Sequence, residues 1–132
     1  MTKFKSEGVI QSLTNAIHGL KLAFFSQRNF VIEIIISLCV VISGFILKFT
    51  VTDICILIIM SSMVLICELL NSVIEFTLDA VYKNNYSRLV EMAKDISAGM
   101  VLLSCIISFI LGAILFGSYI LKLHPDAFIG AA

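Results

Sequence analysis

Four polar side chains follow one another at helical spacing in an otherwise apolar stretch, "ICELLNSVIEFTLD", which covers residues 66–79. They are Glu68, Asn71, Glu75 and Asp79, separated by three, four and four positions. At about 100° per residue, a helix places all four within a sector of roughly 80°. Carboxylates gathered in this way suit a hard cation such as Mg²⁺, which prefers oxygen ligands. The pattern therefore indicates a candidate site on one face of a helix.

The same stripe also has a structural explanation. Polar side chains on a buried helix face can hydrogen-bond a neighbouring helix, and Glu68 and Asn71 are suited to such a seam. Ionisable residues inside an apolar segment are costly, however, and usually mark function. Both explanations predict that the stripe faces protein and not lipid.

The composition of the whole chain indicates a membrane protein. The 132 residues are 60% apolar and 14% charged, with a mean hydropathy of +1.09. A soluble domain of this length has too little interior for that much apolar surface. The nine basic and nine acidic residues balance, which argues against a nucleic-acid partner. We expect one membrane domain over residues 1–132, with all-α architecture.

Hydropathy and periodicity divide the chain into four helical segments. Apolar residues at alternating steps of three and four predict an amphipathic helix over residues 6–25, lying at the membrane surface. Residues 1–21 lack the continuous apolar run and cleavage site of a signal peptide, so we expect the N-terminus to be retained. The predicted transmembrane helices cover residues 30–49, 54–81 and 96–123. Ser104, Ser108 and Gly112 form a small-residue stripe in the third span, which favours close helix packing.

The four cysteines lie inside these apolar runs at irregular spacing. They form no C-x-x-C pattern, so we interpret them as small buried apolar residues and not as a metal site or a disulfide framework. They are Cys39, Cys55, Cys67 and Cys105.

Basic residues predict the orientation in the membrane. Seven of the nine lie before the first span or between the second and third, and only Lys48 and Lys122 lie on the other side. The positive-inside rule then places the N-terminus and the 82–95 loop in the cytoplasm. The stripe on the second span approaches this cytoplasmic surface, and Lys94 and Asp95 begin the third span at the same level. A lysine beside carboxylates suits phosphate handling, although charges at a helix start are also ordinary.

Two segments of the sequence resemble a known family. "ELLNSVIEFTLD" (68–79) followed by "AKDISAGMVLL" (93–103) is similar to the signature of the prokaryotic diacylglycerol kinases. This family comprises small integral-membrane diacylglycerol kinases and the related undecaprenol kinases. Its pattern runs E-[IL]-[LI]-N-[ST]-[AV]-I-E-x-x-x-D and then K-D. The resemblance extends over most of the chain, because the amphipathic helix, "RNF" (28–30) and the three spans also agree.

The resemblance implies an ATP- and Mg²⁺-dependent lipid kinase in the bacterial plasma membrane, assembled as a homotrimer with sites shared between subunits. Glu68 would be the general base that takes the proton from the lipid hydroxyl. Glu75 would hold the metal that bridges the nucleotide phosphates. The other roles implied are nucleotide binding by Lys94, Asp95, Glu75 and Asn15, positioning or support by Asn71 and Asp79, and lining of the substrate region by Glu33.

The sequence departs from the family pattern at two places: the loop has "NYS" (85–87) where the family usually has a sequence like "EYH", and one metal-binding position differs. A second metal-binding glutamate usually precedes the segment that corresponds to "RNF", and here that position is Gln27. An amide offers a neutral oxygen without charge, so metal affinity or activity is expected to be reduced. We therefore keep Gln27 as a candidate ligand of the weaker kind.

Several functions remain open from the sequence. The lipid substrate is expected to be diacylglycerol, with undecaprenol as the alternative within the same class. Gln27 also leaves room for a non-catalytic membrane scaffold, and intramembrane carboxylates occur in proton-relay or transport subunits. Lys94 and Asp95 favour a kinase over a transporter, which has little need of them.

Overall fold

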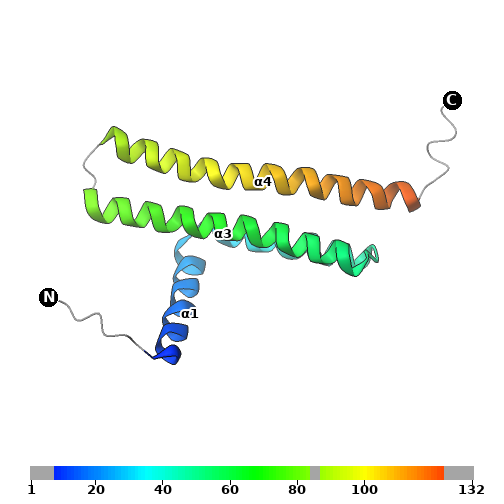
Figure 1. The fold of residues 1–132 in the computed structure, drawn as a ribbon, viewed down its shortest axis with the longest axis horizontal. Coiled ribbons are helices and arrows are strands. Elements are labelled where there is room, and N and C mark those ends of the chain that lie inside the picture. The colour runs from blue at the N-terminus through cyan, green and yellow to red at the C-terminus, as the bar shows by residue number, and fades with distance from the viewer. Residues whose placement is uncertain (1–7, 84–86, 124–132) are drawn as a thin grey trace.

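The computed structural model describes residues 8–83 and 87–123, and within these ranges all regular secondary structure is α-helical (Figure 1). The predicted start of the first helix at residue 6, the tip of the 82–95 loop at 84–86 and the segment 124–132 lie outside the described residues. The helices are α1 (Val9–Ser26), α2 (Arg28–Ile46), α3 (Val51–Tyr82) and α4 (Arg88–Leu123). The last three are long and apolar enough to cross a membrane, in agreement with the prediction of three spans.

The helix boundaries differ from the predicted segments by several residues. α2 begins at Arg28, so only Gln27 separates it from α1, which ends at Ser26. α3 begins at Val51, three residues before the predicted start. The largest difference is in α4, which runs without a break from Arg88 to Leu123, although its first turns are polar. Hydropathy marks where a helix enters an apolar medium, whereas polar residues such as Glu91 are compatible with a helix outside it.

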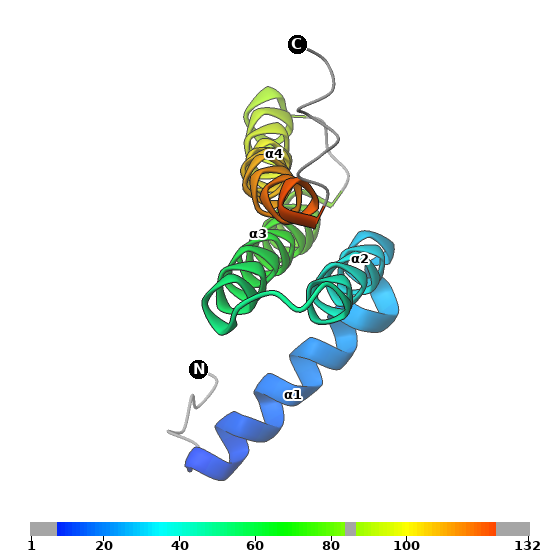
Figure 2. The same ribbon diagram turned by 90° about the vertical axis from the view of Figure 1, so that its right-hand side faces the viewer.

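The three long helices form a bundle from which α1 diverges. α3 and α4 are antiparallel and lie side by side along their length, and α2 packs against α3 (Figures 1 and 2). α1 leaves the N-terminal end of α2 at a steep angle, and the paired ends of α3 and α4 extend beyond this junction (Figure 1). The 32 residues of α3 measure about 48 Å, which exceeds a hydrocarbon core of roughly 30 Å. One end of α3 must therefore project from the apolar layer.

The opposite end of the bundle is closed by the tight connection between α2 and α3. Thr50 caps α3, since its Oγ1 accepts a hydrogen bond from the Asp53 backbone N–H at 3.3 Å. Tyr119 of α4 joins this turn: its hydroxyl donates to Asp53 Oδ2 at 2.7 Å and accepts from the Thr50 backbone N–H at 2.8 Å. The Tyr119 ring stacks on Phe49 with centroids 3.9 Å apart. These contacts attach the C-terminal half of α4 to the α2–α3 turn.

Glycine allows α2 and α3 to approach closely beside that turn. A Cβ atom at Gly44 would lie 2.9 Å from Cδ1 of both Ile54 and Leu57. Leu57 is fully buried, and with Phe49 and Ile54 it forms an apolar cluster. This cluster lies near the connection between α2 and α3, whereas the buried polar residues Glu68, Asn71 and Ser97 lie further towards the other end of the bundle.

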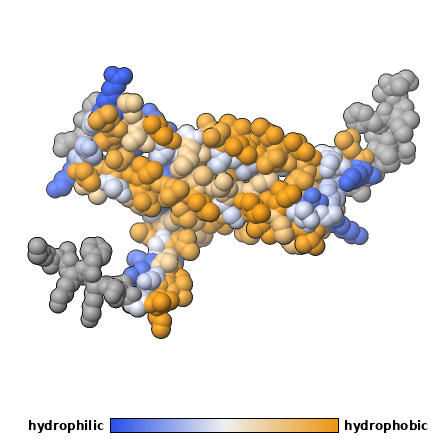
Figure 3. Space-filling model, in the orientation of Figure 1, coloured by the Kyte–Doolittle hydropathy of each residue, from blue (hydrophilic) through white to orange (hydrophobic). Residues whose placement is uncertain are grey.

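Most large apolar side chains face outward. Figure 3 shows them along the length of the bundle, with hydrophilic residues gathered towards its two ends. Lipid is as apolar as a protein interior, so a membrane bundle has no need to bury these side chains. The interior positions are instead free for small and polar residues.

Candidate functional site

The polar stripe of α3 begins on the face that packs against α4. Glu68 and Asn71 are buried, with exposed fractions of 3% and 7%, while Glu75 is half-buried and Asp79 is exposed. Asn71 Nδ2 donates a hydrogen bond to Glu75 Oε1 at 3.2 Å, one turn further along the helix. The four residues therefore run from the protein interior to the projecting end of α3, as the spacing predicts.

Lys94 joins this stripe from the neighbouring helix. Its ammonium forms an ion pair with Asp79, with Nζ 2.5 Å from Oδ1. The adjacent Asp95 is exposed, and among the described residues it makes no side-chain hydrogen bond or ion pair. The structure thus brings Lys94 onto the α3 stripe and leaves Asp95 beside it at the surface of α4.

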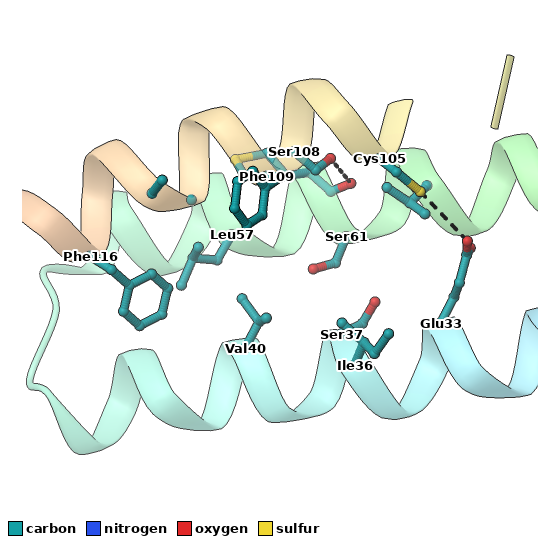
Figure 4. Close-up of a pocket in the computed structure, with 14 residues that line it drawn as sticks. Glu33, Ile36, Ser37, Val40, Leu57, Ser61, Cys105, Ser108, Phe109 and Phe116 are labelled. Atoms are coloured by element: carbon teal, nitrogen blue, oxygen red, sulfur yellow. Dashed lines mark hydrogen bonds between the residues drawn. The ribbon is translucent and has the colours of Figure 1, made fainter. Parts of the chain in front are cut away.

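Glu33 brings α2 to the same site. Its Oε1 accepts a hydrogen bond from Cys105 Sγ on α4 at 3.7 Å, and its buried Oε2 has no hydrogen-bond partner among the described residues (Figure 4). The carboxylate also interacts electrostatically with Glu68, which in turn interacts with Glu75. Three carboxylates from two helices therefore form a chain of like charges, an arrangement that favours binding of cations or of donor groups.

No group in the described part of the chain donates a hydrogen bond to the Glu68 carboxylate. The nearest polar neighbour, Ser72, donates to the Glu68 backbone carbonyl at 3.0 Å and not to its side chain. Both carboxylate oxygens are therefore available to a ligand.

A cavity of about 520 Å³ extends from Glu33 between α2, α3 and α4 (Figure 4). Apolar residues dominate its wall, among them Val40, Leu57 and Phe116 towards the connection end. The cavity has the size and the mixture of apolar wall and few polar groups that are typical of small-molecule sites.

Two candidate residues lie apart from this cluster. Gln27 occupies the junction between α1 and α2, where its side chain has no hydrogen-bond partner among the described residues. Asn15 is exposed on α1, and its Oδ1 accepts a hydrogen bond from Gln11 Nε2 at 3.3 Å. Within a single chain, the structure does not bring Gln27 or Asn15 into hydrogen-bonding contact with the α3 stripe.

The carboxylates of the candidate site provide only part of a metal-binding site. Within residues 8–83 and 87–123, no group of three His, Cys, Asp or Glu side chains is arranged to hold a metal ion. Mg²⁺ usually needs only one or two carboxylates, because substrate phosphates and water complete its octahedral shell. Glu75, with one oxygen engaged by Asn71, and the neighbouring Glu68 are adequate for that reduced role.

Two residues of the site could not be identified from the sequence. Ser97 is 2% exposed, and its hydroxyl lies 2.6 Å from Asn71 Oδ1. Cys105, interpreted only as a small apolar residue, contacts Glu33. The sequence contains one indication of Ser97: its spacing places it one turn after Lys94 on the same helix face.

The predicted small-residue stripe of α4 is only partly used for close packing. Ser104 is buried, and Ser108 donates to the Met60 carbonyl of α3 at 3.4 Å. Gly112 lines the cavity, and a Cβ atom there would meet nothing within 4 Å. In the single chain, no side chain therefore packs closely against Gly112 among the described residues.

Comparison with known proteins relates the sequence to lipid kinases. The family model for prokaryotic diacylglycerol kinase matches residues 14–116. A protein of Synechocystis sp. named diacylglycerol kinase is 34% identical over 107 residues, which cover 81% of this chain and 61% of that protein. A Bacillus subtilis protein named undecaprenol kinase is 29% identical over 106 residues, which cover 80% of this chain and 85% of that protein.

The matched region contains α2, α3 and nearly all of α4, with every residue of the cluster described above. The chain spans about three fifths of the length of the cyanobacterial relative. Because the family model covers well over half of the sequence, the chain belongs to the prokaryotic diacylglycerol kinase family, whose named relatives are lipid kinases.

Proposed function

We propose that the protein is an ATP- and Mg²⁺-dependent kinase that phosphorylates the hydroxyl group of a membrane lipid alcohol. Diacylglycerol is the proposed substrate, which would give phosphatidic acid, and undecaprenol is the alternative. The proposal is carried by one observation: the carboxylates of Glu33, Glu68 and Glu75 interact with one another, and Glu33 also lines a cavity with a largely apolar wall. Lys94 joins the exposed end of the same α3 stripe at Asp79. A water-soluble nucleotide and a lipid alcohol can meet only near the surface of a membrane.

Glu68 is the proposed general base. Its carboxylate takes the proton from the lipid hydroxyl while the hydroxyl oxygen attacks the γ-phosphorus of ATP. The bond from phosphorus to the β–γ bridging oxygen breaks, and ADP leaves with that oxygen. Burial of Glu68 and the absence of a hydrogen-bond donor to it among the described residues support this role.

Glu75, Lys94 and Asp95 are the proposed nucleotide-binding residues, with Glu75 as metal ligand. Bound Mg²⁺ would neutralise the charge of the β- and γ-phosphates. Asn71 orients Glu75 through its amide, and Asp79 keeps Lys94 at the site. Gln27 and Asn15 remain weaker candidates for the metal and the nucleotide, supplied by the same chain or by another subunit.

The cavity supports a lipid substrate. Glu33 lies at its polar end, where the unpartnered Oε2 can accept a hydrogen bond from a lipid headgroup, and the apolar wall continues towards Phe116. We propose that the headgroup lies near Glu33 and Glu68 with a hydrocarbon chain directed along this wall. Either diacylglycerol or a polyprenol supplies such a chain.

The proposed setting is a bacterial plasma membrane, with the N-terminus and the 82–95 loop in the cytoplasm. The surplus of basic residues on that side supports the orientation. α1 would lie at the membrane surface, because its apolar residues are exposed in the single chain. We also propose a homotrimer with sites shared between subunits, which would bring Gln27 or Asn15 of one subunit towards the stripe of another.

A transfer assay tests the function directly. Purified protein in detergent receives ATP labelled at the γ-phosphate, Mg²⁺, and either diacylglycerol or undecaprenol. We expect labelled phosphatidic acid, and undecaprenyl phosphate as the main product would move the assignment to the alternative. A correctly folded protein that labels neither lipid nor any other lipid alcohol would contradict the kinase proposal and favour a non-catalytic scaffold.

A further inference from the structure

Ser97 is the most completely buried polar residue of α4, with an exposed fraction of 2%. It lies one turn after Lys94 and faces α3. Its hydroxyl is 2.6 Å from Asn71 Oδ1 and 2.9 Å from the Lys94 carbonyl oxygen. It thus contacts both the α3 stripe and the backbone of the residue that pairs with Asp79.

Two successive hydrogen bonds connect α4 to Glu75: Ser97 donates to Asn71, and Asn71 donates to Glu75. A serine hydroxyl has a single proton, and both neighbouring atoms are acceptors, so the proton is directed to Asn71 or to the Lys94 carbonyl. The Asn71 amide receives at its oxygen from α4 and donates from its nitrogen to Glu75. Turning the amide over would place its oxygen against the Glu75 carboxylate, which is unfavourable.

We propose that Ser97 is a positioning residue for phosphoryl transfer, holding Asn71 from α4 so that Asn71 can orient Glu75. This inference rests on the proposed kinase function. It assigns Ser97 no contact with substrate. Without the Ser97 hydroxyl, the only side chain that holds the Asn71 amide among the described residues is Glu75, one turn along the same helix.

The alternative is that a serine at position 97 is merely small enough for close packing of α3 against α4. Alanine has the required size without the hydroxyl, and threonine has the hydroxyl with an added methyl group. The substitutions Ser97→Ala and Ser97→Thr therefore separate the hydrogen bond from the volume.

Ser104 offers a matched control on the same helix. It is also buried, at 7% exposure, and its hydroxyl donates to the carbonyl three residues earlier, Val101, at 2.7 Å. Ser97 makes the equivalent bond to Lys94, but only Ser97 also reaches a polar side chain of α3. Ser104→Ala therefore removes this bond and the hydrogen bond with the adjacent Cys105 thiol, but no contact with the α3 stripe.

The experiment measures kcat, the KM for lipid and the Mg²⁺ concentration for half-maximal binding of a non-hydrolysable fluorescent ATP analogue in the wild type and the three variants. Loss of one hydrogen bond that orients a reacting group predicts a fall in kcat of about tenfold for Ser97→Ala. We also expect a several-fold higher Mg²⁺ midpoint with little change in the KM for lipid. Ser97→Thr should recover most of the rate, and Ser104→Ala should stay within about twofold of the wild type.

Three outcomes would overturn the inference. Equal losses in Ser97→Ala and Ser104→Ala would indicate packing alone, and an unchanged Mg²⁺ midpoint in Ser97→Ala would exclude an effect through Glu75. A Ser97→Ala variant with wild-type kinetics would exclude any role. In each of these cases the wild type is active, whereas an inactive wild type would refute the kinase proposal itself and the role of Ser97 with it.

Discussion

Glu68 differs from the other acidic residues of α3 in its burial. Asp53 and Asp79 are at the two ends of the helix and hydrogen-bond to neighbours, whereas the Glu68 carboxylate has no donor among the described residues. A buried carboxylate without a partner is costly unless a substrate uses it. The physical environment of Glu68 therefore supports its proposed role as general base and separates it from Asp53 and Asp79 on the same helix.

Replacement of Glu68 by glutamine should abolish turnover. Glutamine keeps the shape of the side chain but cannot accept the proton, so we expect kcat to fall at least about a hundredfold. Binding of a fluorescent ATP analogue with Mg²⁺ should change little, because Glu75 and Lys94 are intact. Asp53→Asn is the control, since asparagine retains an acceptor oxygen for Tyr119 at the far end of α3. A Glu68→Gln variant with normal turnover would remove Glu68 from the proposed mechanism.

Gln27 is a position where the chain departs from the family pattern. Gln27→Glu adds a carboxylate at the α1–α2 junction, where the present side chain has no hydrogen-bond partner among the described residues. If this position serves the metal, activity at limiting Mg²⁺ should rise, and the gain should vanish at saturating Mg²⁺. Ser12→Glu, at another exposed position of α1, is the control for added negative charge. An equal response in both variants, or none, would show that Gln27 is not a metal ligand.

The helices show how far the sequence determines the elements. The apolar lengths predict the three spans because each long helix must present an apolar surface to lipid. The spacing of the α3 stripe predicts one shared face because helical geometry is fixed. Neither pattern contains the register between helices, so the pairing of Asn71 with Ser97 and of Glu33 with Cys105 could not be derived. Those contacts depend on the connections and on packing between distant segments.

The connection end holds the long helices in register through Tyr119. Its hydroxyl bonds both Asp53 and the Thr50 backbone, so Tyr119→Phe leaves the Thr50 N–H without that partner. We expect the thermal unfolding midpoint in detergent to fall by a few degrees. Tyr82→Phe is the control, because Tyr82 is exposed and makes no hydrogen bond through its hydroxyl among the described residues. Equal midpoints for the two variants would mean that these bonds do not stabilise the fold.

At the scale of the molecule, the hydrophilic surface residues gather towards the two ends of an apolar bundle (Figure 3). The end with Lys83, Arg88 and Lys94 carries the candidate site, and the other end carries Lys48 and Lys122. ATP is found in the cytoplasm, so a kinase requires the first end to face it. The distribution of basic residues and the proposed chemistry thus both predict that the end with the candidate site faces the cytoplasm, for separate physical reasons.

Reporter fusions test that orientation without reference to activity. Green fluorescent protein joined after Lys83 should fluoresce, because the loop that follows α3 is expected in the cytoplasm, where this reporter folds. Alkaline phosphatase joined after Lys48 should be active, since it needs the oxidising space outside the plasma membrane for its disulfides. Exchanging the two reporters provides the control, and both signals should then be lost. The opposite pattern would place the α3 stripe away from ATP and would contradict the proposed kinase at the level of the whole molecule.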